Sequence, residues 1–407
     1  MTAPINAAAV AALSDEVIDW RFKGMPSAWW GRPPAQVCQE APDLFDAGAL
    51  GPVCVLGSEA LHHNMTTMAG WCRERGVELA PHGKTHMAPQ LLERQLAAGA
   101  CAITAATLSQ VRIYRAFGVR DVVLANELVD DAGLRWLSTE LDAHRDFSIA
   151  CWVDSVRGVE LMTAALTAVG ADRPLDVCVE VGMVGGRTGC RGAGAVDEVA
   201  RAAAASPRLR LVGVAGYEAA RGHDTAPDAL AGVTAYLEEM RAAAVRLAPL
   251  FETDRVIVTA GGSTYFDAVA DVLPGDWRTV LRSGCYLTHD VGLYGRTSPL
   301  RERLRPALSV WAQAVSRPER DLAIVAMGRR DVSFDQDLPM PLGLPDSVVT
   351  KLNDQHAYLR LGGGDSVDVG GWLEFGISHP CTVFDKWQLI AELDPERRVV
   401  GLIRTFF

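Results

Sequence analysis

One lysine stands in a segment whose residue types suit covalent chemistry. Lys84 lies in the sequence Pro-His-Gly-Lys-Thr-His, residues 81–86, in a chain whose cations are mostly arginines. A lone lysine is usually solvated. Lysine is also, however, a side chain whose pKa falls readily when it is desolvated, which makes its amine a nucleophile. Lys84 is therefore a candidate for covalent catalysis.

A glycine-rich segment, residues 261–264, has the residue types that hold a phosphate group. Its members are Gly261, Gly262, Ser263 and Thr264. Glycine N–H groups approach an anion closely, the two hydroxyls donate further hydrogen bonds, and a helical pattern follows. The same residues are equally typical of a loop before a helix. An amine beside a phosphate cradle is what a pyridoxal phosphate (PLP) enzyme needs, since the amine forms a Schiff base with the aldehyde.

A histidine and a cysteine near the C-terminus are candidate metal ligands. His379 and Cys381 are two residues apart, so their side chains share a face if this segment is extended. Imidazole with thiolate favours zinc, with manganese or magnesium as alternatives. A buried histidine beside a structural cysteine gives the same pattern, and two ligands are fewer than the usual three of catalytic zinc. His356 is a further candidate contact to the substrate.

The pattern of the chain predicts the scaffold for these candidates. From about residue 52 to residue 285, short apolar runs alternate with stretches of helical period. Eight runs are predicted strands: 77–81, 101–104, 121–125, 147–153, 174–180, 209–216, 255–260 and 279–283. Helical patterns between them favour a closed (β/α)8 barrel, and an open doubly wound sheet is the alternative.

The barrel would explain why distant motifs belong together. Enzymes of this architecture keep their sites at the carboxyl ends of the strands, and phosphate sites recur after strands seven and eight. Residues 261–264 follow the seventh predicted strand. The other loops of this rim contain Lys84, Arg187, Tyr217, His223 and Tyr286.

A β-rich second domain is expected after the barrel. From about residue 297 the chain turns to strand-like runs separated by Gly, Pro and Asp turns, at 306–316, 321–327, 367–376 and 398–407. We expect an α/β fold with the barrel at residues 58–297. The β-rich domain would combine residues 1–57 and 298–407 and contain the metal-ligand motif. Within it, the strand-like segment 52–56 is expected to pair with the later strands.

Composition excludes several classes of protein. The 407 residues include 39 basic and 50 acidic side chains, and the net charge of −11 argues against nucleic acid or an anionic membrane as partner. Nine dilute cysteines are typical of a reduced, cytoplasmic protein. The N-terminus has acids before its first arginine, unlike a secretory signal, and no run of about 18 apolar residues exists.

The combination of motifs resembles the D-serine dehydratase and D-threonine aldolase family, PLP enzymes with the alanine racemase fold. The matching segments occur in the family's order, at 81–86, 97–111, 125–127, 187–189, 261–264 and 378–382. The resemblance implies that Lys84 is the Schiff-base lysine, that Arg187 faces the phenolic oxygen or ring of the cofactor, and that Tyr217 lies at the cofactor. It also implies that Tyr286 and residues 261–264 hold the phosphate, and that the protein is a homodimer.

Two features of the sequence bear on the branch of this family. His379 and Cys381 resemble the zinc ligands of the D-serine dehydratase branch, because the aldolase branch typically has Asp at the second position. The family's Lys-Thr-His-Lys is here Lys-Thr-His-Met, ending at Met87, and residues 326–331 lack the usual acidic pattern. These departures leave the β-substituent of the substrate open.

The expected reaction is β-elimination from a D-3-hydroxy amino acid such as D-serine, giving a 2-oxo acid and ammonia. Lys84 would remove the α-proton, and zinc would stabilise the departing β-oxygen. The alternative is an aldolase for D-threonine or 3-hydroxy-D-aspartate, in which His223 or His356 deprotonates the β-hydroxyl and glycine and an aldehyde result. A second alternative is a non-catalytic PLP carrier, although such proteins usually consist of the barrel alone.

Overall fold

The computed structural model describes residues 4–407 and divides into two compact units. The first contains the described residues up to Asn6 together with Ala69–Lys84 and Gln95–Gly284. The second contains Ala7–Met68, Thr85–Arg94 and Cys285–Phe407. The domain boundaries expected from the sequence, at 57/58 and 297/298, stay predictions, because these units divide the chain at other residues.

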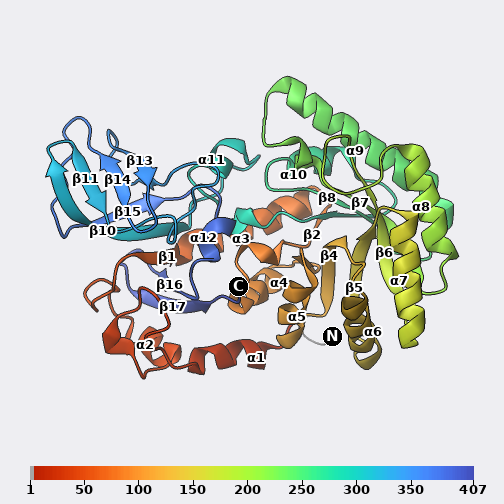
Figure 1. The fold of residues 1–407 in the computed structure, drawn as a ribbon, viewed down its shortest axis with the longest axis horizontal. Helices are drawn as coiled ribbons and strands as arrows, with labels where there is room; N and C mark the ends of the chain where they lie inside the picture. The colour runs from red at the N-terminus through yellow and green to blue at the C-terminus, as the bar shows by residue number, and fades with distance from the viewer. Residues whose placement is uncertain (1–3) are drawn as a thin grey trace. The chain divides into compact units, whose positions relative to one another are not determined.

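The first unit is built on a closed barrel of eight parallel strands (Figure 1). The strands are β2 (Glu78–Leu79), β3 (Ile103–Ala105), β4 (Asp121–Glu127), β5 (Ser148–Val153), β6 (Leu175–Val181), β7 (Leu209–Gly216), β8 (Ile257–Ala260) and β9 (Arg278–Leu281). Their order is β2-β9-β8-β7-β6-β5-β4-β3. The ring closes between β2 and β3, where the Cys101 N–H donates to the Leu79 carbonyl at 2.8 Å and His82 bridges to Thr104. All eight predicted strands are confirmed, and the open-sheet alternative is wrong.

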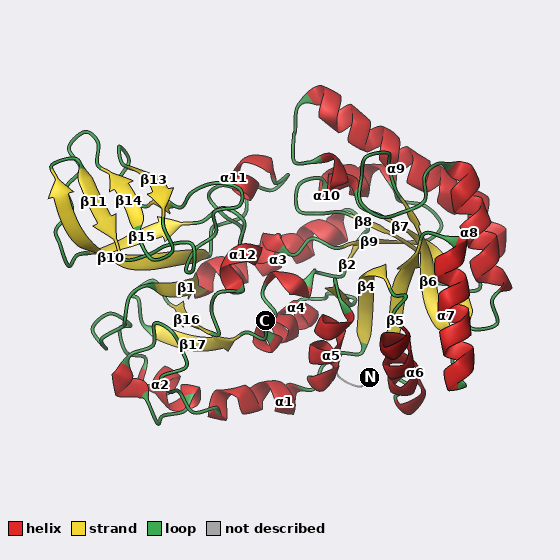
Figure 2. Ribbon diagram, in the orientation of Figure 1, coloured by secondary structure: helices red, strands yellow, loops and turns green. Residues whose placement is uncertain are grey.

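Helices connect the barrel strands, as the alternating pattern predicts (Figure 2). They are α5 (Leu108–Ala116), α6 (Asp131–Ala143), α7 (Val156–Val169), α8 (Ala193–Ala205), α9 (Pro227–Leu247) and α10 (Phe266–Val272). Thr107, Asp130 and Ser155 cap three of them, each accepting a hydrogen bond from the backbone N–H three residues on. Two further helices, α3 (Ser58–Glu74) and α4 (Pro89–Ala97), contain residues of both units.

Apolar side chains fill the middle of the barrel. Every second residue along the strands faces inward, and these residues form one buried cluster that includes Ala80, Val123, Trp152, Cys178 and Val280. The next inward-facing position on each strand lies one step closer to the carboxyl end. Polar residues at those positions would line the mouth of the barrel.

The second unit is dominated by a nine-stranded sheet. The strand β1 (Val53–Gly57) pairs antiparallel with β10 (Leu308–Glu319) and parallel with β16 (Leu389–Leu393). This confirms the expectation that residues 52–56 return to the β-rich part of the chain. The remaining strands are β11 (Leu322–Val325), β12 (Met340–Pro341), β13 (Val348–Leu352), β14 (Ala357–Arg360), β15 (Trp372–Gly376) and β17 (Val399–Arg404).

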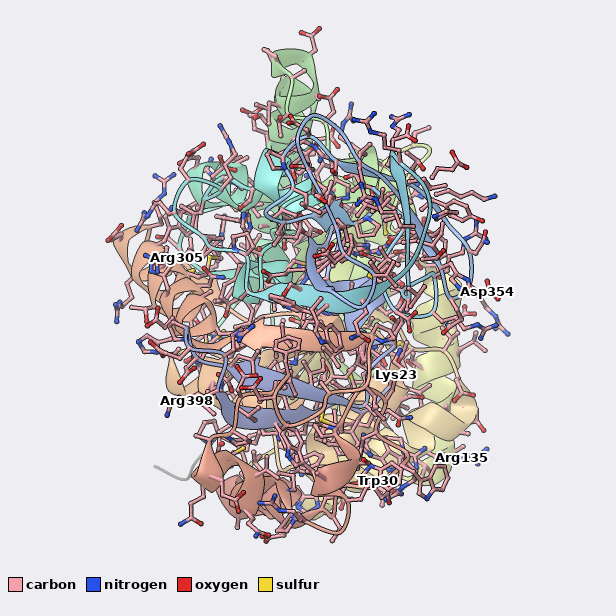
Figure 3. All side chains as sticks on the ribbon, turned by 90° about the vertical axis from the view of Figure 1, so that its left-hand side faces the viewer. Lys23, Trp30, Arg135, Arg305, Asp354 and Arg398 are labelled. Carbon is pink, nitrogen blue, oxygen red and sulfur yellow. The ribbon has the colours of Figure 1, made fainter. Side chains whose placement is uncertain are left out.

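Residues before β1 pack onto this sheet. This segment contains α1 (Ala7–Ala11) and α2 (Pro34–Glu40), and Phe22 and Trp29 lie in the same buried cluster as residues of β16 and β17. Lys23, labelled in Figure 3, donates to Asp331 Oδ1 at 3.0 Å, and its ammonium stands 3.7 Å from the ring centroid of Trp387. Within residues 4–407 no helix combines the length and apolar character needed to span a membrane.

Candidate active site

Lys84 lies in the 3-10 turn Gly83–Thr85, directly after β2. The turn packs closely against α5, because a Cβ on Gly83 would stand 2.5 Å from Tyr114 Oη and 3.0 Å from Ile103 Cγ2. The Lys84 side chain is half-buried at the carboxyl mouth of the barrel. No hydrogen bond or ion pair of its amine is found among residues 4–407. A half-buried amine without such a partner is suited to covalent bonding with an aldehyde.

His82, two residues before Lys84, lies among positive charges. Burial lowers its pKa well below the usual range, and the charges of Lys84, Arg282 and Arg187 lower this pKa further. Its Nδ1 is buried without a hydrogen-bond partner among the described residues. Three cations around a neutral imidazole favour an anionic ligand at this end of the barrel.

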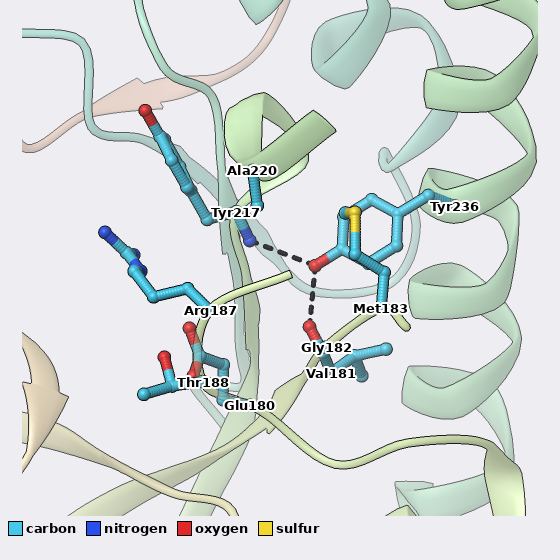
Figure 4. A pocket seen from close by; sticks show the side chains of 9 residues that line it. All are labelled: Glu180, Val181, Gly182, Met183, Arg187, Thr188, Tyr217, Ala220 and Tyr236. Atoms are coloured by element: carbon cyan, nitrogen blue, oxygen red, sulfur yellow. Dashed lines mark hydrogen bonds between the residues drawn. The ribbon is translucent and has the colours of Figure 1, made fainter. Parts of the chain in front are cut away.

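Arg187 and Tyr217, both predicted cofactor contacts, lie together in the structure. The Arg187 guanidinium carbon stands 4.7 Å from the centroid of the Tyr217 ring. Tyr236 of α9 positions the two loops, because its hydroxyl accepts from the Tyr217 N–H at 3.0 Å and donates to the Val181 carbonyl at 2.6 Å (Figure 4). These residues line a small open pocket at the ends of β6 and β7.

The glycine loop follows β8, as predicted, and is held by side chains of the preceding loop. Gly261 has a φ of 93°, a conformation that favours glycine. The N–H groups of Gly261 and Gly262 donate to the Glu218 carboxylate at 3.0 and 2.6 Å. His223 Nδ1 lies 2.7 Å from Thr264 Oγ1. Two expected phosphate donors are therefore bonded to Glu218, so the phosphate-binding role of the loop stays a prediction that would require Glu218 to shift or Ser263 and Thr264 to donate.

Two carboxylates and an arginine, whose roles were not predicted, also line the mouth. Glu127 pairs in register with Trp152, which pairs with Cys178 of β6. Glu180 is two residues beyond Cys178 and faces the same way, into the barrel. Arg282 is 6% exposed and donates to Thr259 Oγ1 at 2.7 Å and to the Gly216 carbonyl at 2.6 Å. The sequence could have indicated these three residues, because each lies two positions beyond an inward-facing apolar residue at the end of a strand.

Glu127 and Glu180 act on each other. Burial is the main cause that raises the pKa of Glu127 to about 8, and the negative charge of the nearby Glu180 carboxylate is the second. Both carboxyl oxygens of Glu127 and Oε2 of Glu180 are buried without a hydrogen-bond partner among residues 4–407. Glu127 therefore keeps its proton at neutral pH, where it can donate a hydrogen bond.

This raised pKa predicts a pH-dependent stability. The unfolded chain releases the Glu127 proton near pH 4.3, but the folded chain keeps it to about pH 8, so the free energy of unfolding falls between these values as pH rises. Because Glu127 is partly exposed, we expect the free energy of unfolding to fall by only about 1–2 kcal/mol over this pH range. Glu127→Gln, which cannot titrate, should remove this fall. Urea unfolding from pH 5 to pH 9 measures it. Glu238→Gln, an exposed site on α9, is the control, and equal slopes for wild type and Glu127→Gln would contradict the assignment.

The predicted metal ligands lie in the second unit. His379 has a φ of 74°, an unfavourable conformation for a residue with a side chain. Its Nδ1 lies 2.5 Å from Asp335 Oδ2, and Thr382 Oγ1 donates to Asp335 Oδ1 at 2.6 Å. Cys381 begins α12 (Cys381–Phe384), and its Sγ lies 3.5 Å from Cys285 Sγ.

These donor types suit zinc, but their number is small. A carboxylate on Nδ1 is a common way to orient a histidine that binds metal through Nε2. Within residues 4–407, however, no group of three or more His, Cys, Asp or Glu side chains is placed to hold a metal ion. The zinc site stays a prediction, and water or substrate would have to complete it.

Two other candidates also lie in the second unit. Tyr286 is 4% exposed in the 3-10 turn Cys285–Leu287. His356 is exposed in the turn between β13 and β14, and no contact with His379 or Cys381 is found for it in the described part of the chain. Their assigned roles stay predictions.

A larger cavity, of about 380 Å³, lies at the opposite end of the barrel, where the strands begin. Its charged residues are largely paired: Arg210 Nε lies 2.7 Å from Asp176 Oδ1, and Arg278 Nε lies 2.7 Å from Glu78 Oε1. Enzymes with this barrel keep their sites at the carboxyl ends of the strands. We therefore assign this cavity to the structure of the barrel and keep the carboxyl end as the candidate active site.

The chain is similar to known proteins over most of its length. The family described as alanine racemase, N-terminal domain, matches residues 56–289, and the putative serine dehydratase domain matches residues 307–392. D-threonine aldolase of Arthrobacter sp is 28% identical over 340 residues, 82% of this chain and 86% of that protein.

Two solved structures are similar over most of the chain. The crystal structure of D-threonine aldolase from Filomicrobium marinum has a TM-score of 0.76 at 26% identity, covering 88% of this chain and 94% of that one. A cysteine-to-alanine variant of D-threo-3-hydroxyaspartate dehydratase, in the metal-free form, has a TM-score of 0.72 at 25% identity, covering 88% and 97%. The chain belongs to the D-serine dehydratase and D-threonine aldolase family, the PLP-dependent lyases that have the alanine racemase fold.

Proposed function

We propose that this lyase acts on D-3-hydroxy amino acids and eliminates the β-hydroxyl, releasing a 2-oxo acid and ammonia. The observation that supports it best is the half-buried amine of Lys84 at the barrel mouth, with Arg187 and Arg282 nearby. The named substrates of the similar enzymes, D-threonine and D-threo-3-hydroxyaspartate, are both D-amino acids with a 3-hydroxyl group. Family membership also removes the non-catalytic carrier from the alternatives.

The residues at the barrel mouth and the predicted metal ligands of the second unit have separate tasks in this reaction. PLP, when bound, supplies an aldehyde for the amine and a conjugated ring that spreads negative charge from Cα. Lys84 Nζ accepts the α-proton of the substrate. Arg187, held over the Tyr217 ring, provides a cation for an anionic oxygen, and protonated Glu127 provides a hydrogen-bond donor. His379 and Cys381 would hold zinc, which supplies a Lewis acid for the β-oxygen.

Cleavage of the Cα–Cβ bond is the second candidate. It requires a base for the β-hydroxyl instead of a departing hydroxide, and D-threonine aldolase is among the similar proteins. His223 of the first unit is the candidate base, and it is half-buried and lies 2.7 Å from Thr264 Oγ1 through its Nδ1. The cysteine at position 381 favours elimination, because the aldolase branch that the sequence resembles typically has Asp at this position.

Product analysis separates the two reactions. The purified protein is incubated with D-serine, D-threonine and 3-hydroxy-D-aspartate, and 2-oxo acid, ammonia, glycine and aldehyde are measured. We expect equal amounts of 2-oxo acid and ammonia. Glycine with aldehyde and no 2-oxo acid would overturn the elimination proposal in favour of the aldolase.

The metal proposal predicts a specific role for Asp335. Asp335→Asn should weaken zinc binding by about 10-fold to 100-fold, because the carboxylate that orients His379 is lost. Competition with a chromophoric chelator measures the affinity. Asp337→Asn is the matched control, since Asp337 bonds Arg296 and Ser378 instead of His379. If the two variants bind zinc equally well, His379 is not the ligand that Asp335 orients.

A further inference from the structure

Cys285 and Cys381 meet although they are 96 residues apart in the sequence. Their Sγ atoms are separated by 3.5 Å, and both thiols are free. Thr85 Oγ1 contacts the same pair, at 3.5 Å from Cys381 Sγ and 4.0 Å from Cys285 Sγ. All three residues belong to the second unit.

A disulfide between these cysteines requires a small approach of the two sulfurs. A disulfide bond is about 2.05 Å long, so the sulfurs must come about 1.5 Å closer. Cys285 begins a three-residue 3-10 turn, and Cys381 begins a four-residue helix. Segments this short have few backbone hydrogen bonds to oppose a shift of the side chain and its Cα. Leu293 and Tyr294 pack beside both sulfurs in one small cluster.

We propose that Cys285 and Cys381 form a site of reversible disulfide formation by peroxides. Cys381 is the partly exposed member of the pair, and Cys285 is 5% exposed. Peroxide therefore reaches Cys381 first, and Cys285 is the resolving cysteine next to it. The other seven cysteines are also free, and we expect them to take no part.

The chemistry is a two-electron oxidation of the pair. The Cys381 thiolate attacks one oxygen of hydrogen peroxide, the O–O bond breaks, hydroxide leaves, and Cys381 becomes a sulfenic acid. The Cys285 sulfur then attacks the sulfenic sulfur, the S–O bond breaks, and water leaves with the Cys285 proton. Both sulfurs are oxidised and the peroxide is reduced. A dithiol reverses the bond by thiol exchange.

The disulfide would also remove a metal ligand. This consequence rests on the proposed function, because it requires that Cys381 binds zinc. A sulfur in a disulfide has no thiolate to offer, so the oxidised pair cannot hold zinc through Cys381. Conversely, bound zinc should protect the pair from peroxide.

The experiment treats the full-length, reduced, zinc-free protein with hydrogen peroxide, removes the oxidant, and counts alkylatable thiols after denaturation. We expect the count to fall from nine to seven, since 9 − 2 = 7, with one cross-linked peptide joining residues 285 and 381. Dithiothreitol should restore all nine. A count that stays at nine, or a cross-link between other cysteines, would overturn the proposal.

Two variants and an experiment with added zinc test whether the thiols are lost through this particular pair. Cys285→Ser should form no cross-link, whereas Cys38→Ser, which removes another partly exposed cysteine, should cross-link at the wild-type rate. Equal loss of thiols in both variants would contradict the pairing. With zinc added first, the wild-type rate should fall at least tenfold. An unchanged rate would count against Cys381 as a zinc ligand, but it would not contradict the disulfide proposal. The two proposals are therefore tested separately.

Discussion

Lys84→Ala is expected to lack the absorption band at roughly 410–430 nm that PLP acquires on joining a lysine. Its lyase activity should fall by at least about a thousandfold, because the amine is both the covalent attachment and the base for the α-proton. Borohydride reduction of wild type should abolish the band and fix the cofactor to one peptide. The chain has four lysines, so the labelled residue is identified without ambiguity.

Lys351→Ala is the matched control for this substitution. Lys351 lies in β13, and its ammonium stands 5.2 Å from the Tyr358 ring centroid, so its removal should change neither the band nor the activity. If Lys84→Ala retains the band, or if borohydride labels another lysine, the covalent assignment is wrong. If Lys84→Ala loses the activity but keeps the band, Lys84 is a base and not the attachment site.

The barrel could be predicted because its strands are buried on both faces. Residues such as Val177, Cys178 and Val179 of β6 are all fully buried, which gives a continuous apolar run that differs clearly from the helices around it. The second unit was harder. β12 has only two residues, and β16 lies in an apolar stretch ending in Ala-Glu-Leu that has no strand-like alternation.

The site could be predicted in part, for a physical reason. Lys84, Arg187 and residues 261–264 follow strands directly, so barrel topology alone brings them to one rim. The contacts of Glu218 and Asp335 could not be predicted. Glu218 reaches the glycine loop, and Asp335 reaches His379 from 44 residues away, through side-chain directions that no sequence period specifies.

The buried Arg282 at the barrel mouth leads to the second prediction, a large loss of stability when this arginine is replaced. Burial lowers the pKa of Arg282, and the nearby carboxylates of Glu218 and Glu180 oppose this by favouring the charged guanidinium. Glu218 is 0% exposed and Glu180 is 3% exposed. Arg282→Met keeps the volume but leaves both carboxylates without this cation, and it also leaves Thr259 and the Gly216 carbonyl without their donor. We expect the free energy of unfolding to fall by about 3–5 kcal/mol.

Urea unfolding of the cofactor-free protein measures this loss, with Arg210→Met as the control. Arg210 occupies the opposite end of the same barrel and pairs with Asp176, but its side chain is 44% exposed, so its removal should cost less than about 1 kcal/mol. Arg210 even bonds both oxygens of a carboxylate, whereas Arg282 donates to a hydroxyl and a backbone carbonyl, so a larger loss at Arg282 would reflect its burial. Similar losses for the two variants would mean that water reaches the mouth of the barrel and solvates Glu180 and Glu218 when the guanidinium is gone. In that case the mouth could not strengthen the electrostatic interactions on which the proposed chemistry depends.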